Sequence, residues 1–359
     1  MIELIVAIAT LAVLSAILSP LFSRGQSRRV GAVAAAGTMA MCLTALPTQA
    51  QGLPDIWSGR AKCTIENRAL GSAFGMHFIA TYAESPTSLL TYYISNNANG
   101  SATGLAITRD GINFTNMGVV LTQGPNVFDN RLASFPGVAA LDGSRIAMVY
   151  EAAGKSSSYP GDIGLALSSN GRQFTKDPSP ILVHARRQPG DANLNLNWER
   201  NNIGTPSLVV VGNTRYLFYH GFGKSWESGS PDDCQVGVAV GTDLRNMTRY
   251  SGNPIIKTGA RGTWDSGSIG RRSIQRGSDG WWYLVYEGST DQPYDRASWS
   301  TGLARSRDLL NWQKFSGNPI LPRTASGFGY DGPELVLLNG RTYIYFRNGA
   351  TYRAIVSWR

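Results

Sequence analysis

The chain has 359 residues, of which 42% are hydrophobic and 16% charged, with 41 glycines, 17 prolines, 9 tryptophans and 15 tyrosines. This turn-rich, aromatic composition is typical of a folded β protein and argues against disorder. The net charge of +9 comes from scattered basic residues without a nucleic-acid motif. The scatter favours a solvated basic surface, or one that meets anionic glycans, over binding of nucleic acid.

Residues 1–50 have the features of a signal or targeting segment. A charged start at Ser27–Arg29 is followed by the apolar stretch Val30–Leu46 and by small residues, the order found in secretory signals. We therefore expect export to the periplasm or the medium, by a route left open, and a single folded domain over residues 51–359. An earlier apolar stretch, residues 4–22, is either a membrane anchor or the product of a start codon placed too early.

Cysteine and histidine spacing gives no metal or cofactor site. Cys63 and Cys234 are the two cysteines outside the leader, and they form either one disulfide or two separate buried thiols. His77, His184 and His220 have no metal-ligand spacing, and no dinucleotide or phosphate-binding motif is present. The sequence therefore predicts neither a metal nor a cofactor, and it leaves the oligomeric state open.

Internal repetition is the strongest signal in the chain. Four stretches read Gly-apolar-Ala and end four residues after the Ala on Asp or Asn: Gly104–Asp110, Gly164–Asn170, Gly237–Asp243 and Gly302–Asp308. Each predicts a strand that runs into a turn, preceded by a hairpin of two apolar runs.

Four antiparallel strands per unit, repeated about every 60 to 70 residues, predict an all-β fold, a five-bladed β-propeller of four-stranded antiparallel blades. A two-sheet sandwich and separate domains are the alternatives. The last unit, from Tyr330, has room for three strands, so its outermost strand is either missing or supplied by residues near Pro54–Lys62.

An acidic residue precedes the expected innermost strand of each unit. The five acids are Glu66, Asp129, Glu199, Asp265 and Asp331, at spacings of 63, 70, 66 and 66 residues. Because inner strands start at one end of a propeller, these carboxyl groups are predicted to surround one funnel. Paired carboxyl groups there suit glycosidic bond cleavage, whereas each acid alone suits a turn cap.

Other polar and aromatic residues are expected at the same end. The second strands end in aromatic-polar pairs, namely Tyr150-Glu151, Tyr219-His220, Tyr286-Glu287 and Phe346-Arg347. The predicted substrate-binding residues are Arg131, Trp198, His220, Trp264, Arg271, Glu287 and Arg347. The alternatives are packing between blades for the tryptophans and solvated rim charges for the rest.

With these motifs the sequence resembles the five-bladed glycoside hydrolases of families 43, 32, 62 and 68 and their relatives 117 and 130. The likeness rests on Gly302–Trp312, Asn318–Leu321 and Tyr330–Glu334. It implies a base in the first blade, a tuning acid in the third and a proton donor in the fourth. By blade, those positions hold Glu66, Glu199 and Asp265, which differ in type from the family's Asp, Asp and Glu. The resemblance thus indicates a divergent member, in which Asp129 or Asp331 takes a catalytic role.

The sequence-based hypothesis is a glycosidase that cleaves an oligo- or polysaccharide, with arabinofuranosyl linkages as the first candidate. Its main rival is a propeller lectin that binds carbohydrate without cleaving it. A sialidase ranks third, because Thr108–Gly111 only partly matches an Asp box.

Overall fold

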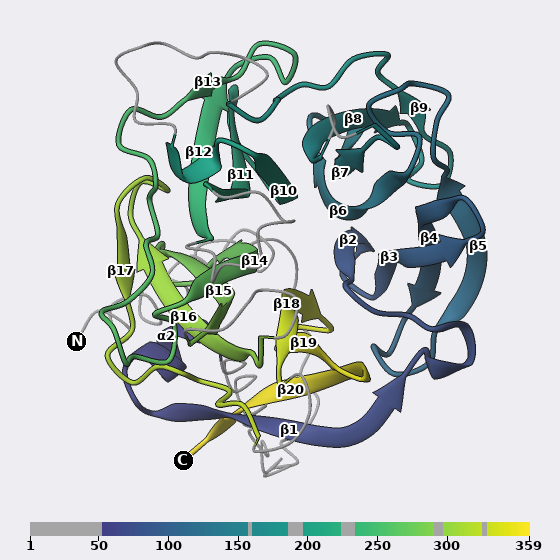
Figure 1. Ribbon diagram of the computed structural model, residues 1–359. Helices are drawn as coiled ribbons and strands as arrows, with labels where there is room; N and C mark the ends of the chain where they lie inside the picture. The colour runs from purple at the N-terminus through teal and green to yellow at the C-terminus, as the bar shows by residue number, and fades with distance from the viewer. Residues whose placement is uncertain (1–51, 157–159, 186–196, 224–233, 291–296, 325–328) are drawn as a thin grey trace, which may run out of the picture. The chain divides into compact units, whose positions relative to one another are not determined.

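The computed structural model describes residues 52–156, 160–185, 197–223, 234–290, 297–324 and 329–359. These residues form twenty strands and three short helical turns, α2 (Leu53–Trp57), η2 (Ser72–Phe74) and η3 (Asn197–Glu199) (Figure 1). The all-β prediction is confirmed. The expected leader, residues 1–50 with the stretch 4–22, lies outside the described residues. In the described ranges, no helix is long and apolar enough to span a bilayer.

The strands pair antiparallel with their neighbours in the chain (Figure 1). One four-stranded sheet contains β10 (Asn202–Val211), β11 (Thr214–Phe222), β12 (Gln235–Gly241) and β13 (Thr248–Arg249). Another contains β14 (Ser268–Arg276), β15 (Trp282–Ser289), β16 (Ser300–Ser306) and β17 (Trp312–Lys314).

An eight-stranded sheet consists of two antiparallel groups of four strands. The first group is β2 (Ala80–Ser85), β3 (Ser88–Asn97), β4 (Gly100–Thr108) and β5 (Thr115–Leu121). The second is β6 (Leu132–Ala140), β7 (Ile146–Ala153), β8 (Asp162–Ser168) and β9 (Thr175–Lys176). A single parallel bridge between Ser101 and Leu132 joins the two groups.

The remaining sheet joins the two ends of the domain. Its strands are β18 (Asp331–Leu338), β19 (Arg341–Asn348), β20 (Ala350–Trp358) and the N-terminal β1 (Ala61–Leu70), which pairs with β20. The prediction that an N-terminal strand completes the last unit is confirmed, although the strand lies mostly beyond Pro54–Lys62.

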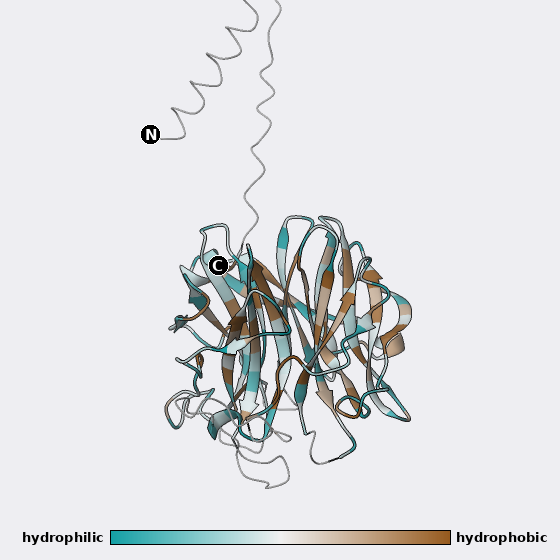
Figure 2. Cartoon of the chain, turned by 90° about the horizontal axis from the view of Figure 1, so that it is seen from above, coloured by the Kyte–Doolittle hydropathy of each residue, from teal (hydrophilic) through white to brown (hydrophobic). Residues whose placement is uncertain are grey.

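The first strand of every group faces a common centre. β2 contacts β6, β6 contacts β10, β10 contacts β14, β14 contacts β18, and β18 contacts β2. Apolar clusters lie between consecutive groups; one joins Val149 and Leu165 to Ile203 and Leu217. In Figure 2 the apolar residues lie mainly on the strands, which also carry polar residues. Sheets that pack face to face around a centre are consistent with a propeller.

The repeated glycines make room for aromatic rings on neighbouring strands. A Cβ atom added at Gly164 would lie 2.2 Å from the Tyr150 ring, and one at Gly302 would lie 2.5 Å from the Trp264 ring. The repeated Asp and Asn residues cap the following turns, as Asp308 does by accepting hydrogen bonds from backbone N–H groups. The repeat therefore encodes packing and turns.

The two cysteines are not bridged. Cys63 lies half-buried on β1, Cys234 is buried before β12, and no disulfide joins them. Burial raises the pKa of the Cys63 thiol to about 12, so this thiol stays protonated and unreactive. Of the two alternatives from the sequence, separate thiols is correct.

Candidate functional site

Three of the predicted acids form matching buried triads within their sheets. Asp129, 0% exposed, accepts hydrogen bonds from the Tyr150 hydroxyl at 3.0 Å and the Lys176 ammonium at 2.7 Å. Asp265 accepts the same bonds from Tyr286 and Lys314, at 3.2 and 2.6 Å. In each triad the acid precedes the first strand, the tyrosine lies on the second and the cation on the fourth.

Glu199 completes the third triad, with Arg249 of β13 as its cation and Tyr219 of β11 as its tyrosine. Burial raises the pKa of the Glu199 carboxyl group, and the Arg249 guanidinium partly offsets this. All three acids are therefore bonded to strands of their own sheet. A position bordering an open funnel, as predicted, does not fit these buried bonds.

Trp198 and Trp264 belong to the same internal packing. The Trp198 ring stacks on Tyr219 with centroids 5.7 Å apart, and its edge lies over Gly237. Trp264 lies 5.4 Å from the Tyr286 ring and over Gly302. The packing alternative thus fits both tryptophans, of which Trp198 is buried and Trp264 half-buried.

The expected position of Glu66 is wrong. Glu66 lies on β1, the outer strand of the last sheet, directly opposite Arg353 of β20, with which it forms an ion pair. The inner strand of the first group is β2, which begins only at Ala80. Glu66 therefore lies away from the inner strands.

Asp331 differs from the triad acids in its offset. It is the first residue of β18, whereas Asp129 and Asp265 precede their strands by three residues. Its carboxylate forms a bidentate pair with Arg347 of β19, at 2.9 Å from Nε to Oδ1 and 2.5 Å from Nη2 to Oδ2. Asp331 and the triad acids are therefore not at equivalent structural positions, although their spacing in the sequence is regular.

The inner strands carry bulges beside this position. In β6, β10, β14 and β18 the register shifts, leaving residues 135–136, 205–206, 270–271 and 332–333 without cross-strand partners. Proline is the second such residue at Pro136, Pro206 and Pro333, where a missing N–H costs nothing. Other N–H groups at the bulges are freed from the ladder and can bind a side chain.

Two glutamates accept hydrogen bonds from these freed N–H groups. Glu151 Oε2, on β7, accepts from Thr205 of the next sheet at 2.8 Å. Glu287, on β15, accepts from Arg271 at 2.7 Å and from Gly332 of the next sheet at 2.6 Å. Each glutamate thereby connects its own group of strands to the following one.

These residues belong to one polar assembly, the inner-strand cluster: His77, Glu151, His220, Arg271, Glu287, Asp331, Glu334 and Arg347. Arg271 reaches from β14 to the carbonyl oxygen of Ile79, at 2.6 Å. Glu334 accepts bonds from the N–H and hydroxyl groups of Thr81, at 2.8 and 3.0 Å. The cluster therefore links β14 and β18 to the first group around the common centre.

His220 lies beside Glu151. A Cβ atom added at Gly204 would lie 2.2 Å from Glu151 Oε2 and 2.9 Å from His220 Nε2, so both side chains pack on this glycine. His220 Nδ1 lies 2.7 Å from the Thr205 hydroxyl. Burial and the nearby Arg272 hold the pKa of His220 well below its usual range, so its imidazole is neutral.

Burial raises the pKa of the carboxyl groups of the cluster. Burial raises the pKa of Glu151 to about 7. Burial, followed by the neighbouring Asp331 charge, raises the pKa of Glu287 to about 7. Burial also raises the pKa of Asp331, against the effect of Arg347. Perturbed carboxyl groups gathered in one place are typical of a functional site.

His77 and Phe78 lie beside the pair formed by Asp331 and Arg347. The Arg347 guanidinium lies 4.1 Å from the centre of the Phe78 ring. Burial chiefly lowers the pKa of His77, Arg347 lowers it further and Asp331 raises it. Arg131, another predicted substrate-binding residue, is exposed and donates to the Gly154 carbonyl, and its charge lowers the pKa of Glu151.

Of the predicted site residues, the structure brings together Asp331, His220, Arg271, Glu287 and Arg347. The sequence placed Glu151 only among strand-end pairs and gave no role to His77 or Glu334. Strand alternation was the available signal: Tyr150 turns toward the triad, so the next residue turns to the opposite face.

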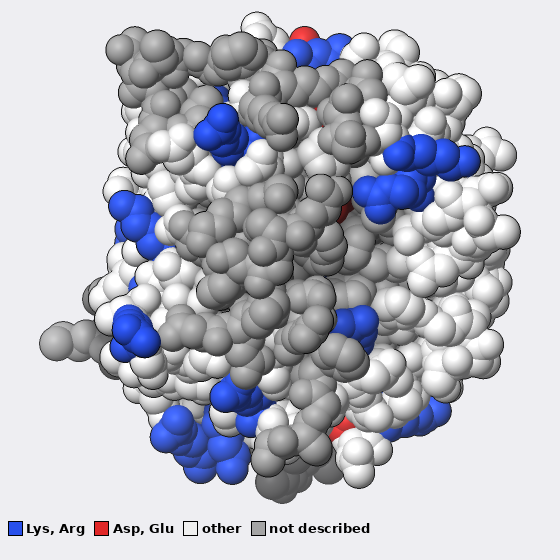
Figure 3. All heavy atoms as spheres, in the orientation of Figure 1, with Lys and Arg blue, Asp and Glu red and all other residues white. Residues whose placement is uncertain are grey.

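On the face seen in Figure 3, Lys and Arg side chains are spread widely and few acids are visible. The spread agrees with the scatter expected from the sequence. Among the described residues, no group of three or more His, Cys, Asp and Glu side chains is arranged to hold a metal ion.

No protein-family model matches the sequence, and no curated protein matches it. Solved structures do resemble it. A complex of BT0996 with RGII aligns with a TM-score of 0.66 at 17% identity, over 85% of this chain and 94% of that one. A thermostable family-43 glycoside hydrolase gives 0.61 at 16% identity, over 82% and 92%.

An exo-1,5-α-L-arabinanase from a bovine ruminal metagenomic library gives a TM-score of 0.52 at 14% identity, over 79% of this chain and 92% of that one. The resemblance to propeller glycoside hydrolases is thereby confirmed for the fold, at an identity that indicates wide divergence.

Proposed function

We propose that the chain is an exported glycoside hydrolase on a five-bladed propeller, with its catalytic carboxyl groups in the inner-strand cluster. The closed series of contacts among β2, β6, β10, β14 and β18 supports five blades. The single bridge within the eight-stranded sheet supports reading that sheet as two blades. The likeness to glycoside hydrolases supports a carbohydrate substrate.

The observation that carries the proposal is a carboxyl group with a pKa of about 7 in one cluster with an arginine-bound carboxylate. Glycosidic cleavage needs a carboxylic acid to protonate the leaving oxygen and a carboxylate to activate water or attack the anomeric carbon. We assign the first role to Glu151, whose pKa lies near 7. We assign the second to Asp331.

Glu287 is a positioning residue in this scheme. It binds the N–H of Gly332, the residue that follows Asp331, and so fixes the backbone that carries the carboxylate. We assign no catalytic role to the predicted acids Glu66, Asp129, Glu199 and Asp265. Their carboxyl groups bond within a sheet and serve packing and strand pairing.

Leaving-group dependence tests the assignment. Glu151→Gln should lose about 10²- to 10⁴-fold in kcat/KM on a methyl or sugar arabinofuranoside, yet keep most activity on a 2,4-dinitrophenyl arabinofuranoside, whose departure needs no proton. Asp331→Asn should lose activity on both. Glu66→Gln, an acid outside the cluster, is the control and should match the wild type.

Equal losses on both leaving groups for Glu151→Gln would remove it as proton donor. A panel of plant and bacterial polysaccharides tests the function itself. Binding without any released product from every member would favour the lectin over the hydrolase.

A further inference from the structure

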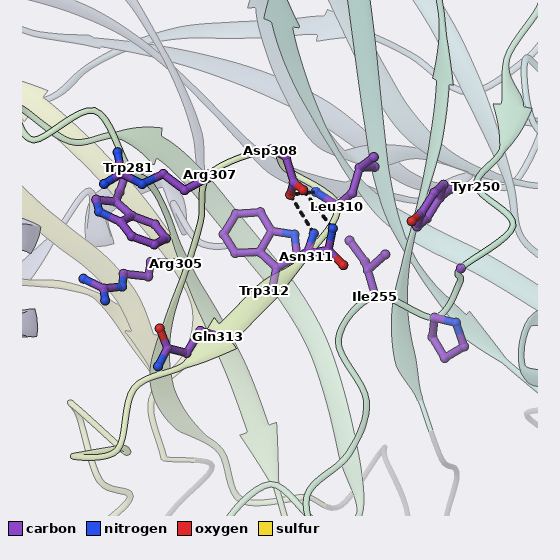
Figure 4. Close-up of a pocket in the computed structure, with 12 residues that line it drawn as sticks. Tyr250, Ile255, Trp281, Arg305, Arg307, Asp308, Leu310, Asn311, Trp312 and Gln313 are labelled. Carbon is purple, nitrogen blue, oxygen red and sulfur yellow. Dashed lines mark hydrogen bonds between the residues drawn. The ribbon is translucent and has the colours of Figure 1, made fainter.

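A pocket lies at the outer strands of the sheet formed by β14 to β17. It has a volume of about 560 Å³ and is formed by β16, β17 and the segment Tyr250–Ile255 after β13 (Figure 4). This size suits one or two sugar rings. Because β16 and β17 are the outer strands of their sheet, the pocket is separate from the inner-strand cluster.

Three lining residues, Trp281, Arg305 and Arg307, form an alternating stack of aromatic rings and guanidinium groups that continues to Trp57 outside the lining. The Arg305 guanidinium lies 4.1 Å from the ring centre of Trp57 and 4.1 Å from that of Trp281. The Arg307 guanidinium lies 4.0 Å from the Trp281 ring centre, on the face opposite Arg305 (Figure 4). The order is therefore Trp57, Arg305, Trp281, Arg307.

The stack fixes the guanidinium groups of Arg305 and Arg307, which are positively charged and can bind an anion. Guanidinium groups that stack on aromatic rings keep fixed planes, and their N–H edges stay available to a carboxylate. Within the described residues, neither Arg305 nor Arg307 forms an ion pair, and Arg305 Nε has no hydrogen-bond partner. A site that holds two arginines without pairing either of them directly with a carboxylate favours an acidic ligand.

The acid in the pocket does not neutralise this pair. Asp308 Oδ1 accepts hydrogen bonds from the N–H groups of Leu310 and Asn311, at 3.0 and 2.8 Å, and Oδ2 accepts one from the Asn311 side chain at 2.8 Å (Figure 4). These bonds hold the pKa of Asp308 at about 2. Its charge serves the turn between β16 and β17.

The rest of the lining suits a sugar. Trp312 stands in the pocket with its indole N–H fixed on the Leu309 carbonyl at 3.0 Å, and Tyr250 lies across from it (Figure 4). Rings of this kind pack against the C–H face of a sugar. The Gln313 side chain adds a group able to bond hydroxyls.

We propose that this pocket is an accessory binding site for an oligosaccharide that carries carboxylate groups, a uronic acid oligomer. The inference rests on the proposed carbohydrate substrate for its ligand class, but not on hydrolysis. An acidic chain held on the outer strands keeps the enzyme on a polymer while the inner-strand cluster acts on another part of it.

Titration calorimetry with a galacturonic acid tetramer tests the site, with a neutral arabinose tetramer as the comparison probe. The exported chain should bind the acidic tetramer, and Arg307→Gln should weaken that binding roughly tenfold or more. Arg307→Lys should fall between them, because it keeps the charge and loses the planar fork. Affinity for the neutral tetramer should change less than about twofold.

Arg341→Gln is the matched control, since it removes one exposed positive charge from β19, outside the pocket. Equal effects of Arg307→Gln and Arg341→Gln, or no binding of the acidic tetramer, would overturn the site. Arg307→Gln should retain full activity on an aryl arabinofuranoside. Arg307-dependent binding in a protein without hydrolysis would leave this site standing and remove the proposed hydrolase.

Discussion

The triads and the inner-strand cluster contain the same kinds of residue, but the triads hold the sheets together and the cluster forms the candidate site. Tyr150 and Glu151 are neighbours on β7, yet Tyr150 bonds Asp129 inside its own sheet and Glu151 bonds Thr205 of the next one. Successive side chains of a strand point to opposite faces. One face therefore carries the fold's internal bonds and the other carries the candidate site.

The two regions differ most in the groups that bond their buried carboxyl groups. Each triad acid has a lysine or arginine at bonding distance, so its charge is compensated where it is buried. In the cluster, Asp331 is likewise paired with Arg347, but Glu151 and Glu287 accept hydrogen bonds from backbone N–H groups, and burial raises their pKa values to about 7. Compensated acids suit structure, and poised acids suit proton transfer.

The largest expected effect concerns activity. Asp331→Asn should lower kcat/KM by about 10³-fold or more, since it removes the carboxylate that acts on the anomeric carbon. Asp129→Asn should leave the activity of the folded fraction within about threefold. Steady-state rates on an aryl arabinofuranoside, normalised to folded protein, check this contrast. Comparable losses in both variants would erase the distinction between the regions.

The triads should dominate stability. Lys176→Met leaves the fully buried Asp129 without its cation, and breaking such a pair costs about 3–5 kcal/mol. Lys314, whose side chain is 33% exposed against 12% for Lys176, should cost less when replaced by Met, because water can reach Asp265. Urea unfolding of the two variants measures the difference. The reverse order would show that burial does not set the strength of the triads.

Repetition made the fold predictable, and it also produced the main error. The closing strand and the capped turns follow from residues that recur once per unit. The period alone does not fix the offset within a unit, so Asp331, at the start of β18, was grouped with Asp265, three residues before β14. Connections of different length can absorb such an offset.

The cluster was only partly predictable because its bonds cross between sheets. Glu287 bonds the N–H of Gly332, which is 45 residues away in the chain, and such bonds depend on bulges that no local pattern announced. Gly332 and Thr205 have φ values of 58° and 38°. Pro333 and Pro206 were the available signs of irregular strands.

The pH dependence of stability should separate the regions next. The pKa of Glu151 rises from 4.5 to about 7 on folding, so the folded state binds more protons between these values. The free energy of unfolding should therefore fall as the pH rises from 4.5 to 7, by about 3 kcal/mol for this group. Glu151→Gln can keep its bond to Thr205 and should flatten this slope. Urea unfolding at pH 5, 6, 7 and 8 measures it, and an unchanged slope would contradict the raised pKa.

The smallest effects come from adding one methyl group to each region. Gly164→Ala drives a Cβ atom into the Tyr150 ring and should cost about 1–3 kcal/mol of stability, because overpacking a rigid ring displaces strands. Gly204→Ala meets the flexible end of Glu151, so stability should change little while activity falls about 10²-fold through the displaced carboxyl group. Gly143→Ala, with open space around the new atom, is the control for both. Thermal unfolding and kcat/KM measured on all three variants should show a loss of stability for Gly164→Ala and a loss of activity for Gly204→Ala. If both variants lost stability and neither lost activity, Glu151 would have a packing role and no catalytic one.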